Sequence, residues 1–145
     1  MILLALFVMI VAVSAPWATS GSSEVPAYNP GPPAKDAKLP PILTRDQLWG
    51  NDAQFPYQMR AYELAATIPD VLHQQPCYCF CSRVGHKSLR TCFETTHGAR
   101  CGTCLRELYY TYRESKSGKT AAQIRKGIIA GEWQQIDLET ATSIK

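Results

Sequence analysis

The sequence predicts a mainly α-helical protein: a small helical domain around a cysteine- and histidine-rich loop, with a disordered proline-rich tether on its N-terminal side. Three observations predict this class. Apolar residues recur at helical spacing in the C-terminal half, threonine–glutamine pairs mark helix starts, and no run of alternating β-branched residues indicates a strand. A chain of 145 residues has room for one compact domain with flanking segments.

Residues 1–20 are expected to be a signal peptide or a short N-terminal membrane segment. The stretch from Ile2 to Ala15 is almost wholly apolar, and small residues follow it, as in a secretory signal. The apolar stretch is shorter than the roughly 20 residues that cross a bilayer, so an uncleaved anchor is the second choice. We therefore expect an exported, periplasmic or otherwise extracytoplasmic protein that contacts the membrane only through this segment.

Residues 21–43 are predicted to be a disordered linker. They are rich in Ser, Gly, Pro, Ala and Lys and include Pro30-Gly31-Pro32-Pro33 and Pro40-Pro41. Such a composition has too little apolar surface to offset the entropy that ordering would cost. The helical domain is therefore expected over residues 44–138, with a tail at 139–145.

Two capping boxes predict helix starts. Thr44 with Gln47, and Thr120 with Gln123, have the spacing at which the two residues satisfy each other's free backbone N–H groups. Short helices should begin just after each threonine, and Gly131 should end the second one.

Two prolines predict helices between these points. Pro56 and Pro69 suit the first turn of a helix, where no backbone donor is needed. We expect helices over residues 57–66 and 69–73, with a break at Pro76.

A longer helix is predicted after the last cysteine and should end near Ser117-Gly118. Its apolar face has the i, i+3, i+4, i+7 spacing and consists of Leu105, Leu108, Tyr109 and Tyr112. Further along, three apolar residues are expected to pack on the domain: Trp133, Ile136 and Leu138.

The candidate site lies between Cys77 and Cys104, in an irregular loop from Gln75 to Thr103 and the residue that follows it. It comprises all six cysteines and two of the three histidines: Cys77, Cys79, Cys81, Cys92, Cys101, Cys104, His86 and His97. The third histidine, His73, stands apart and is expected to be a solvated or capping residue.

The CxCxC run is expected to be extended. In an extended chain successive side chains alternate, so Cys77, Cys79 and Cys81 would share one face. Cys101 and Cys104 form a CxxC pair at a helix start, where unpaired N–H groups favour thiolates. Together these spacings predict that the sulfurs converge.

Convergence leaves metal binding and disulfide formation open. An exported small protein with an even number of cysteines is by default a disulfide framework. However, three bridges from one CxCxC run would be crowded and would leave the two histidines without a role. Metal binding is therefore favoured, and thiol–disulfide redox chemistry is a weaker alternative.

Copper and zinc are the metals considered. Six sulfurs and two imidazoles suit two closed zinc sites, each with three sulfurs and one nitrogen. The same donors suit Cu(I), including a small cluster with bridging sulfurs. Copper is favoured because CxCxC packs sulfur more densely than a structural zinc site requires.

The charge distribution bears on partners. From Arg83 to Lys126 there are ten Lys or Arg and three Glu, a local net charge of +7. No helix-turn-helix or aromatic RNA-binding signature accompanies these cations, so no nucleic acid is expected. The cations are expected to lower thiol pKa values and offset thiolate charge, and a protein partner in the cell envelope is an alternative use of the basic surface.

Residues 68–133 resemble a bacterial family of uncharacterised exported proteins and lipoproteins named for its Pro-Cys-Tyr-Cys-Gly-Cys (PCYCGC) motif. The motif here reads Pro76-Cys77-Tyr78-Cys79-Phe80-Cys81. Phe80 replaces the family's glycine, which should make the segment more extended. The family has no established activity, so the resemblance implies an exported cysteine-rich protein and no particular reaction.

The sequence therefore predicts an exported metal-binding protein that handles or sequesters copper, and not an enzyme. It has no Ser/His/Asp pattern and no glycine-rich phosphate loop. Leu105 stands where covalent haem attachment would need histidine. The alternative is an interaction module stabilised by disulfides or zinc.

Overall fold

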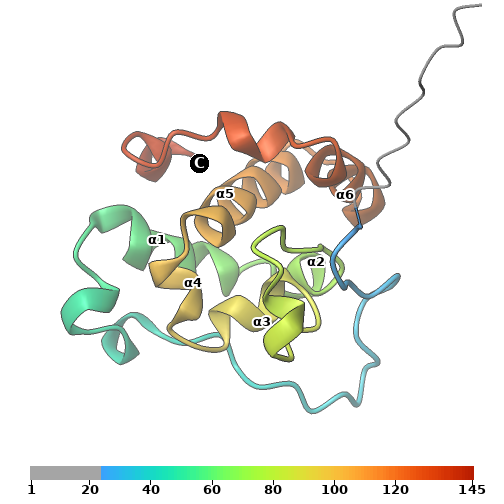
Figure 1. The fold of residues 1–145 in the computed structure, drawn as a ribbon, viewed down its shortest axis with the longest axis horizontal. Coiled ribbons are helices and arrows are strands. Elements are labelled where there is room, and N and C mark those ends of the chain that lie inside the picture. The colour runs from blue at the N-terminus through green and yellow to red at the C-terminus, as the bar shows by residue number, and fades with distance from the viewer. Residues whose placement is uncertain (1–23) are drawn as a thin grey trace, which may run out of the picture.

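The computed structural model describes residues 24–145, so the predicted signal segment lies outside the described residues. Within that range the protein is helical and contains no β-strand, as predicted (Figure 1). The α-helices are α1 (Pro56–Ala65), α2 (Pro69–His73), α3 (Leu89–Phe93), α4 (His97–Arg100), α5 (Gly102–Lys116) and α6 (Ala121–Ile129). Single 3-10 turns occupy η1 (Arg45–Gln47), η2 (Gly50–Asp52), η3 (Cys81–Val84), η4 (Glu132–Gln135) and η5 (Ala141–Ser143). Among the described helices, none is long and apolar enough to cross a bilayer.

Helix α5 is the centre of the fold. It contacts each of the other five α-helices (Figure 1). Its predicted apolar face is buried, and further buried residues extend around the helix: Cys104, Glu107, Tyr110 and Thr111. A helix buried on most sides belongs to the core, so α5 is the element on which the shorter helices pack.

The predicted helix starts are confirmed, with one difference in extent. Pro56 and Pro69 occupy the first turns of α1 and α2. The Thr120 side chain accepts a hydrogen bond from the Gln123 backbone N–H at 3.3 Å, at the start of α6. The capping box at Thr44 forms too, but the helix that follows it is a single 3-10 turn.

The predicted irregular loop contains two short helices that the sequence did not indicate. Helix α3 has five residues and α4 has four. Helices of this length show too little periodicity to be recognised, and they are not stable alone in water. Their packing against α1, α5 and each other therefore holds them in place.

Residues 24–43, the N-terminal strap, form no helix or strand but lie against the domain along its edge (Figure 1). Asn29 Nδ2 donates a hydrogen bond to the His73 carbonyl at 2.9 Å. Arg90 Nη2 donates to the Pro40 carbonyl at 2.8 Å. Two further contacts are the Arg125 guanidinium over the Tyr28 ring and the Leu43 N–H on the Phe93 carbonyl. The composition of the strap gave no sign of these contacts.

The C-terminal apolar residues pack on the domain, as predicted. Ile136 is buried, and Trp133 and Leu138 pack against the core. The Trp133 ring also stacks on Tyr78, with ring centroids 6.5 Å apart. The segment after α6 therefore covers the neighbourhood of the CxCxC run.

The prediction of an extended CxCxC run is wrong. The Phe80 N–H donates to the Cys77 carbonyl at 3.1 Å, which closes a turn. Phe80 itself adopts φ 55° and ψ 28°, the left-handed conformation, although it replaces a glycine. Its ring lies edge-on to Tyr78 and under the Arg83 guanidinium. These contacts outweigh the local cost of a positive φ, so tertiary packing overrides the preference of the residue.

We expect Phe80→Gly to be more stable than Phe80→Ala, by about 1 kcal/mol in the free energy of unfolding. Both variants lose the ring, but only alanine retains the strain of the left-handed conformation. Urea denaturation of the two variants under identical metal conditions measures the difference.

Val84, which is 75% exposed and has no positive φ, provides the matched control. There the order should reverse, with Val84→Ala more stable than Val84→Gly, because glycine loses more chain entropy on folding. If glycine is the less stable replacement at both positions, Phe80 is not strained.

Candidate metal centre

Separate segments of the chain deliver the predicted donors to one place. The turn at residues 77–80 and the adjoining η3 carry the CxCxC run, and His86 follows η3. Helix α3 carries Cys92, α4 begins at His97, and α5 begins beside the CxxC pair. All six cysteines are free thiols. The structure therefore brings together all eight predicted site residues, although the CxCxC backbone is not extended.

The sulfur atoms are close to one another but are not bonded. Cys77 Sγ lies 3.4 Å from Cys79 Sγ and 3.4 Å from Cys104 Sγ. Cys79 Sγ and Cys104 Sγ are 3.6 Å apart. A tetrahedral ion with metal–sulfur bonds of about 2.3 Å would hold its sulfurs about 3.8 Å apart. The spacing is therefore close to that of sulfurs around a common ion.

Cys92 is the centre of a second group of close contacts in the cluster. Its Sγ is 3.4 Å from Cys81 Sγ and 3.4 Å from His86 Nδ1. The His86 and His97 rings are perpendicular, with centroids 5.1 Å apart. His97 Nε2 in turn lies 3.6 Å from Cys79 Sγ. Both histidines therefore contact sulfurs of the cluster, His86 at Cys92 and His97 at Cys79.

Three sets of four residues have ligand atoms that all lie within 4.8 Å of one another. The sets are Cys77, Cys79, Cys92 and Cys104; Cys79, Cys81, Cys92 and His97; and Cys79, His97, Cys101 and Cys104. Cys79 belongs to all three, and no two sets are separate. The residues could hold a metal ion, and they form one connected cluster instead of two independent sites.

Burial divides the cluster into an inner and an outer part. Four cysteines are buried: Cys77, Cys81, Cys92 and Cys104. The other four donors are partly exposed: Cys79, Cys101, His86 and His97. The site thus has a buried interior and an edge that is accessible to solvent.

The α3–α4 connection is held by a buried tyrosine and a glycine. Tyr62 of α1 donates its hydroxyl to the Thr95 carbonyl at 2.7 Å and accepts the Ala99 N–H at 3.0 Å. A Cβ added to Gly98 would lie 2.9 Å from the Cys92 carbonyl oxygen, closer than real Cβ atoms come. Glycine at this position therefore lets α4 approach α3, which brings their donors together.

Glu107 is a buried site neighbour that sequence reasoning missed. Its Oε1 accepts the Tyr78 N–H at 2.7 Å, which fixes the CxCxC turn against α5. Oε2 has no hydrogen-bond partner among the described residues. Burial raises the pKa of Glu107 to about 8, even though hydrogen bonds from Cys77 and Tyr78 oppose that shift. The i, i+3 spacing from Cys104 was the available signal, because it puts both side chains on one face of a helix.

The pKa values of the thiols are shifted in opposite directions. The pKa of Cys79 is lowered, because Cys101 and Cys104 donate hydrogen bonds to its thiolate. The pKa of Cys104 is raised, because hydrogen bonds with Cys101 and Cys77 favour its protonated form and burial adds to the effect. Closely spaced thiols cannot all ionise without a compensating cation, so metal binding here would release protons.

The arginines beside the cysteines in the sequence have other partners. Arg83 covers the Phe80 ring, Arg90 pairs with Glu94, Arg100 pairs with Asp52, and Arg106 donates to the Ile136 carbonyl. The expectation that these cations offset thiolate charge thus finds no contact to support it among the residues 24–145.

His73 stays outside the cluster, as expected. It ends α2 and lines a surface pocket with residues of the strap and of the segment before α3. Burial lowers its pKa, and Arg90 adds to that effect. None of the three donor sets includes it.

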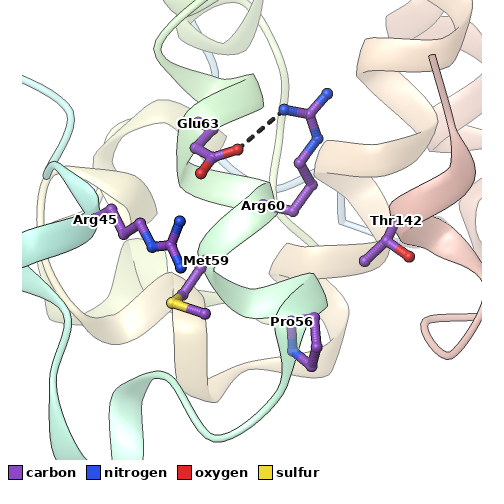
Figure 2. A pocket seen from close by; sticks show the side chains of 6 residues that line it. All are labelled: Arg45, Pro56, Met59, Arg60, Glu63 and Thr142. Carbon is purple, nitrogen blue, oxygen red and sulfur yellow. Dashed lines mark hydrogen bonds and ion pairs between the residues drawn. The ribbon is translucent and has the colours of Figure 1, made fainter.

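A second surface pocket lies at α1 and contains no predicted donor. Figure 2 shows its lining and the exposed ion pair between Arg60 and Glu63, with a nitrogen–oxygen distance of 3.0 Å. The residues are Arg45, Pro56, Met59, Arg60, Glu63 and Thr142. None of the residues that line this pocket belongs to a set of metal ligands.

Comparison with known proteins identifies a family. A family model described as "Protein of unknown function with PCYCGC motif" matches residues 49–136. That range extends beyond the expected family-like core on both sides and includes the whole cluster. No curated protein matches the chain, and no solved structure matches it. The chain therefore belongs to the PCYCGC-motif family of proteins of unknown function.

Proposed function

We propose that this protein is an exported metal-binding protein that handles or sequesters copper through its cysteine cluster. The observation that carries the proposal is the approach of free sulfurs to 3.4–3.6 Å from one another around Cys79. Such crowding is costly for thiolates without a cation. A bound soft metal ion would remove that cost.

The number and type of donors favour Cu(I) over zinc. A closed structural zinc site needs four ligands, whereas six sulfurs are gathered here. Thiolate-rich sites select Cu(I) among the soft ions. Zinc is the second choice, because its tetrahedral geometry suits the sets of four donors.

The partly exposed edge supports handling of the ion over permanent burial. Cys101 and His97 lie at this edge, where a small thiol or a protein partner of the cell envelope could reach a bound ion. We propose no catalytic step; none of the eight donors lines one of the described pockets. The apolar start of the chain supports export, with the domain acting outside the cytoplasmic membrane.

The alternative is an interaction module in which the cysteines serve stability alone, through zinc or disulfides. The pairs Cys77–Cys104 and Cys81–Cys92, with sulfurs 3.4 Å apart in each pair, are near enough to oxidise after small movements. The same experiments distinguish this alternative from copper handling.

The full-length protein, purified without oxygen, should contain copper or zinc and six free thiols. Elemental mass spectrometry gives the metal content, and intact mass under native and denaturing conditions gives the thiol count. A chain without metal and lighter by six hydrogens, after export into metal-replete medium, would show a disulfide framework. When equal amounts of Cu(I) and zinc compete, copper should be retained; retention of zinc would favour the structural alternative.

His97→Ala should weaken Cu(I) binding by at least about 100-fold, because loss of a ligand should exceed the 10–100-fold effect of losing an outer partner. Affinity is measured by competition with a chromogenic Cu(I) chelator. His73→Ala is the matched control, since His73 belongs to none of the donor sets, and its affinity should equal that of the unmodified protein. Equal weakening in both variants would contradict the assignment of His97.

A further inference from the structure

We propose that the cluster holds two metal ions, bridged by the thiolates of Cys79 and Cys104. This inference rests on the proposed metal-binding function and specifies how the donors are divided. One ion occupies an inner set and the other an outer set, and the two sets share these two sulfurs. The centre is then a single binuclear unit.

The donor sets define the two positions. The inner set is Cys77, Cys79, Cys92 and Cys104, and the outer set is Cys79, His97, Cys101 and Cys104. Each supplies four ligand atoms, the number that one tetrahedral ion requires. The two shared atoms are both sulfurs, 3.6 Å apart. A thiolate has lone pairs for two ions, so sharing them is chemically sound.

The third donor set does not add a further independent ion. It would use Cys81, Cys92 and Cys79 with the same imidazole as the outer set. One imidazole nitrogen binds one ion, so these two sets compete for His97. The outer set has the advantage of the CxxC spacing, which presents both sulfurs from one helix start.

Cys81 and His86 then have a supporting role. Each contacts Cys92 Sγ at 3.4 Å. Cys92 is a terminal ligand of the inner ion, and hydrogen bonds to its sulfur would orient it. All eight predicted residues are thereby used, six as ligands and two as partners of a ligand.

Charge also favours a second ion. The two proposed positions together have five thiolate ligands. A single Cu(I) ion balances the charge of one thiolate and a single zinc ion that of two, so a second ion doubles the compensation in either case. Four cysteine sulfurs of the cluster are buried. Buried negative charge without a partner is strongly unfavourable. Two ions sharing sulfurs leave the interior closer to neutral.

Cadmium-113 tests the bridge directly, because it is a soft, tetrahedral probe with a nuclear spin. The full-length protein loaded with cadmium-113 should bind two ions per chain, measured by native mass spectrometry. Its cadmium NMR spectrum should contain two resonances, each split by coupling to the other ion. Shared thiolates provide the short through-bond path that such coupling needs.

Variants of terminal ligands locate the two ions. Cys101→Ser should lose the outer ion and Cys77→Ser the inner ion, so each retains one ion and shows one unsplit resonance. Thr103→Ser, inside the same CxxC run, changes no proposed ligand and should keep two coupled resonances.

The outcomes separate this inference from the function on which it rests. A single ion per chain, or two resonances without mutual splitting, would overturn the bridge while metal binding stands. Loss of both ions in Cys101→Ser, with Thr103→Ser unaffected, would also overturn the division into inner and outer positions. A protein that binds no cadmium, copper or zinc would overturn both proposals.

Discussion

The burial of cysteine sulfurs in the core, within 3.4–3.6 Å of one another, is the constraint on which the rest of this structure depends. Cys77, Cys81, Cys92 and Cys104 are part of the buried core, so the same side chains fill the interior and form the candidate site. In such an arrangement the free energy of binding a metal ion would also be folding free energy. The cysteines of the site are therefore also part of what holds the fold together.

The helix lengths fit this view. Helices α2, α3 and α4 have five, five and four residues, too few to be stable without tertiary contacts. The 15-residue helix α5 supports all of them and contributes Cys104 to the cluster and Glu107 to the turn that carries Cys77 and Cys79. One long helix thus positions both the core and the donors.

The sequence was a good guide where a local pattern determines the structure. Capping boxes and first-turn prolines located α1, α2 and α6, and the cysteine spacing identified which residues meet. The sequence did not predict the conformation of the CxCxC run, because Phe80 adopts its positive φ only with the contacts that its ring makes in the folded chain. Helices α3 and α4 were missed because four or five residues carry no visible period. Glu107 was overlooked because it follows Arg106 in a charged pair that is typical of a solvent-exposed position, although its spacing from Cys104 placed it on the same side of the helix.

The N-terminal strap limits how far the domain can stand from whatever holds the start of the chain. Twenty extended residues could span about 70 Å. In this structure residues 24–43 follow the surface of the domain and are fixed to it at Asn29, Pro40 and Leu43. In this conformation they therefore do not act as an extended spacer in front of the domain. If the start of the chain were anchored, these contacts would restrict the orientation of the domain.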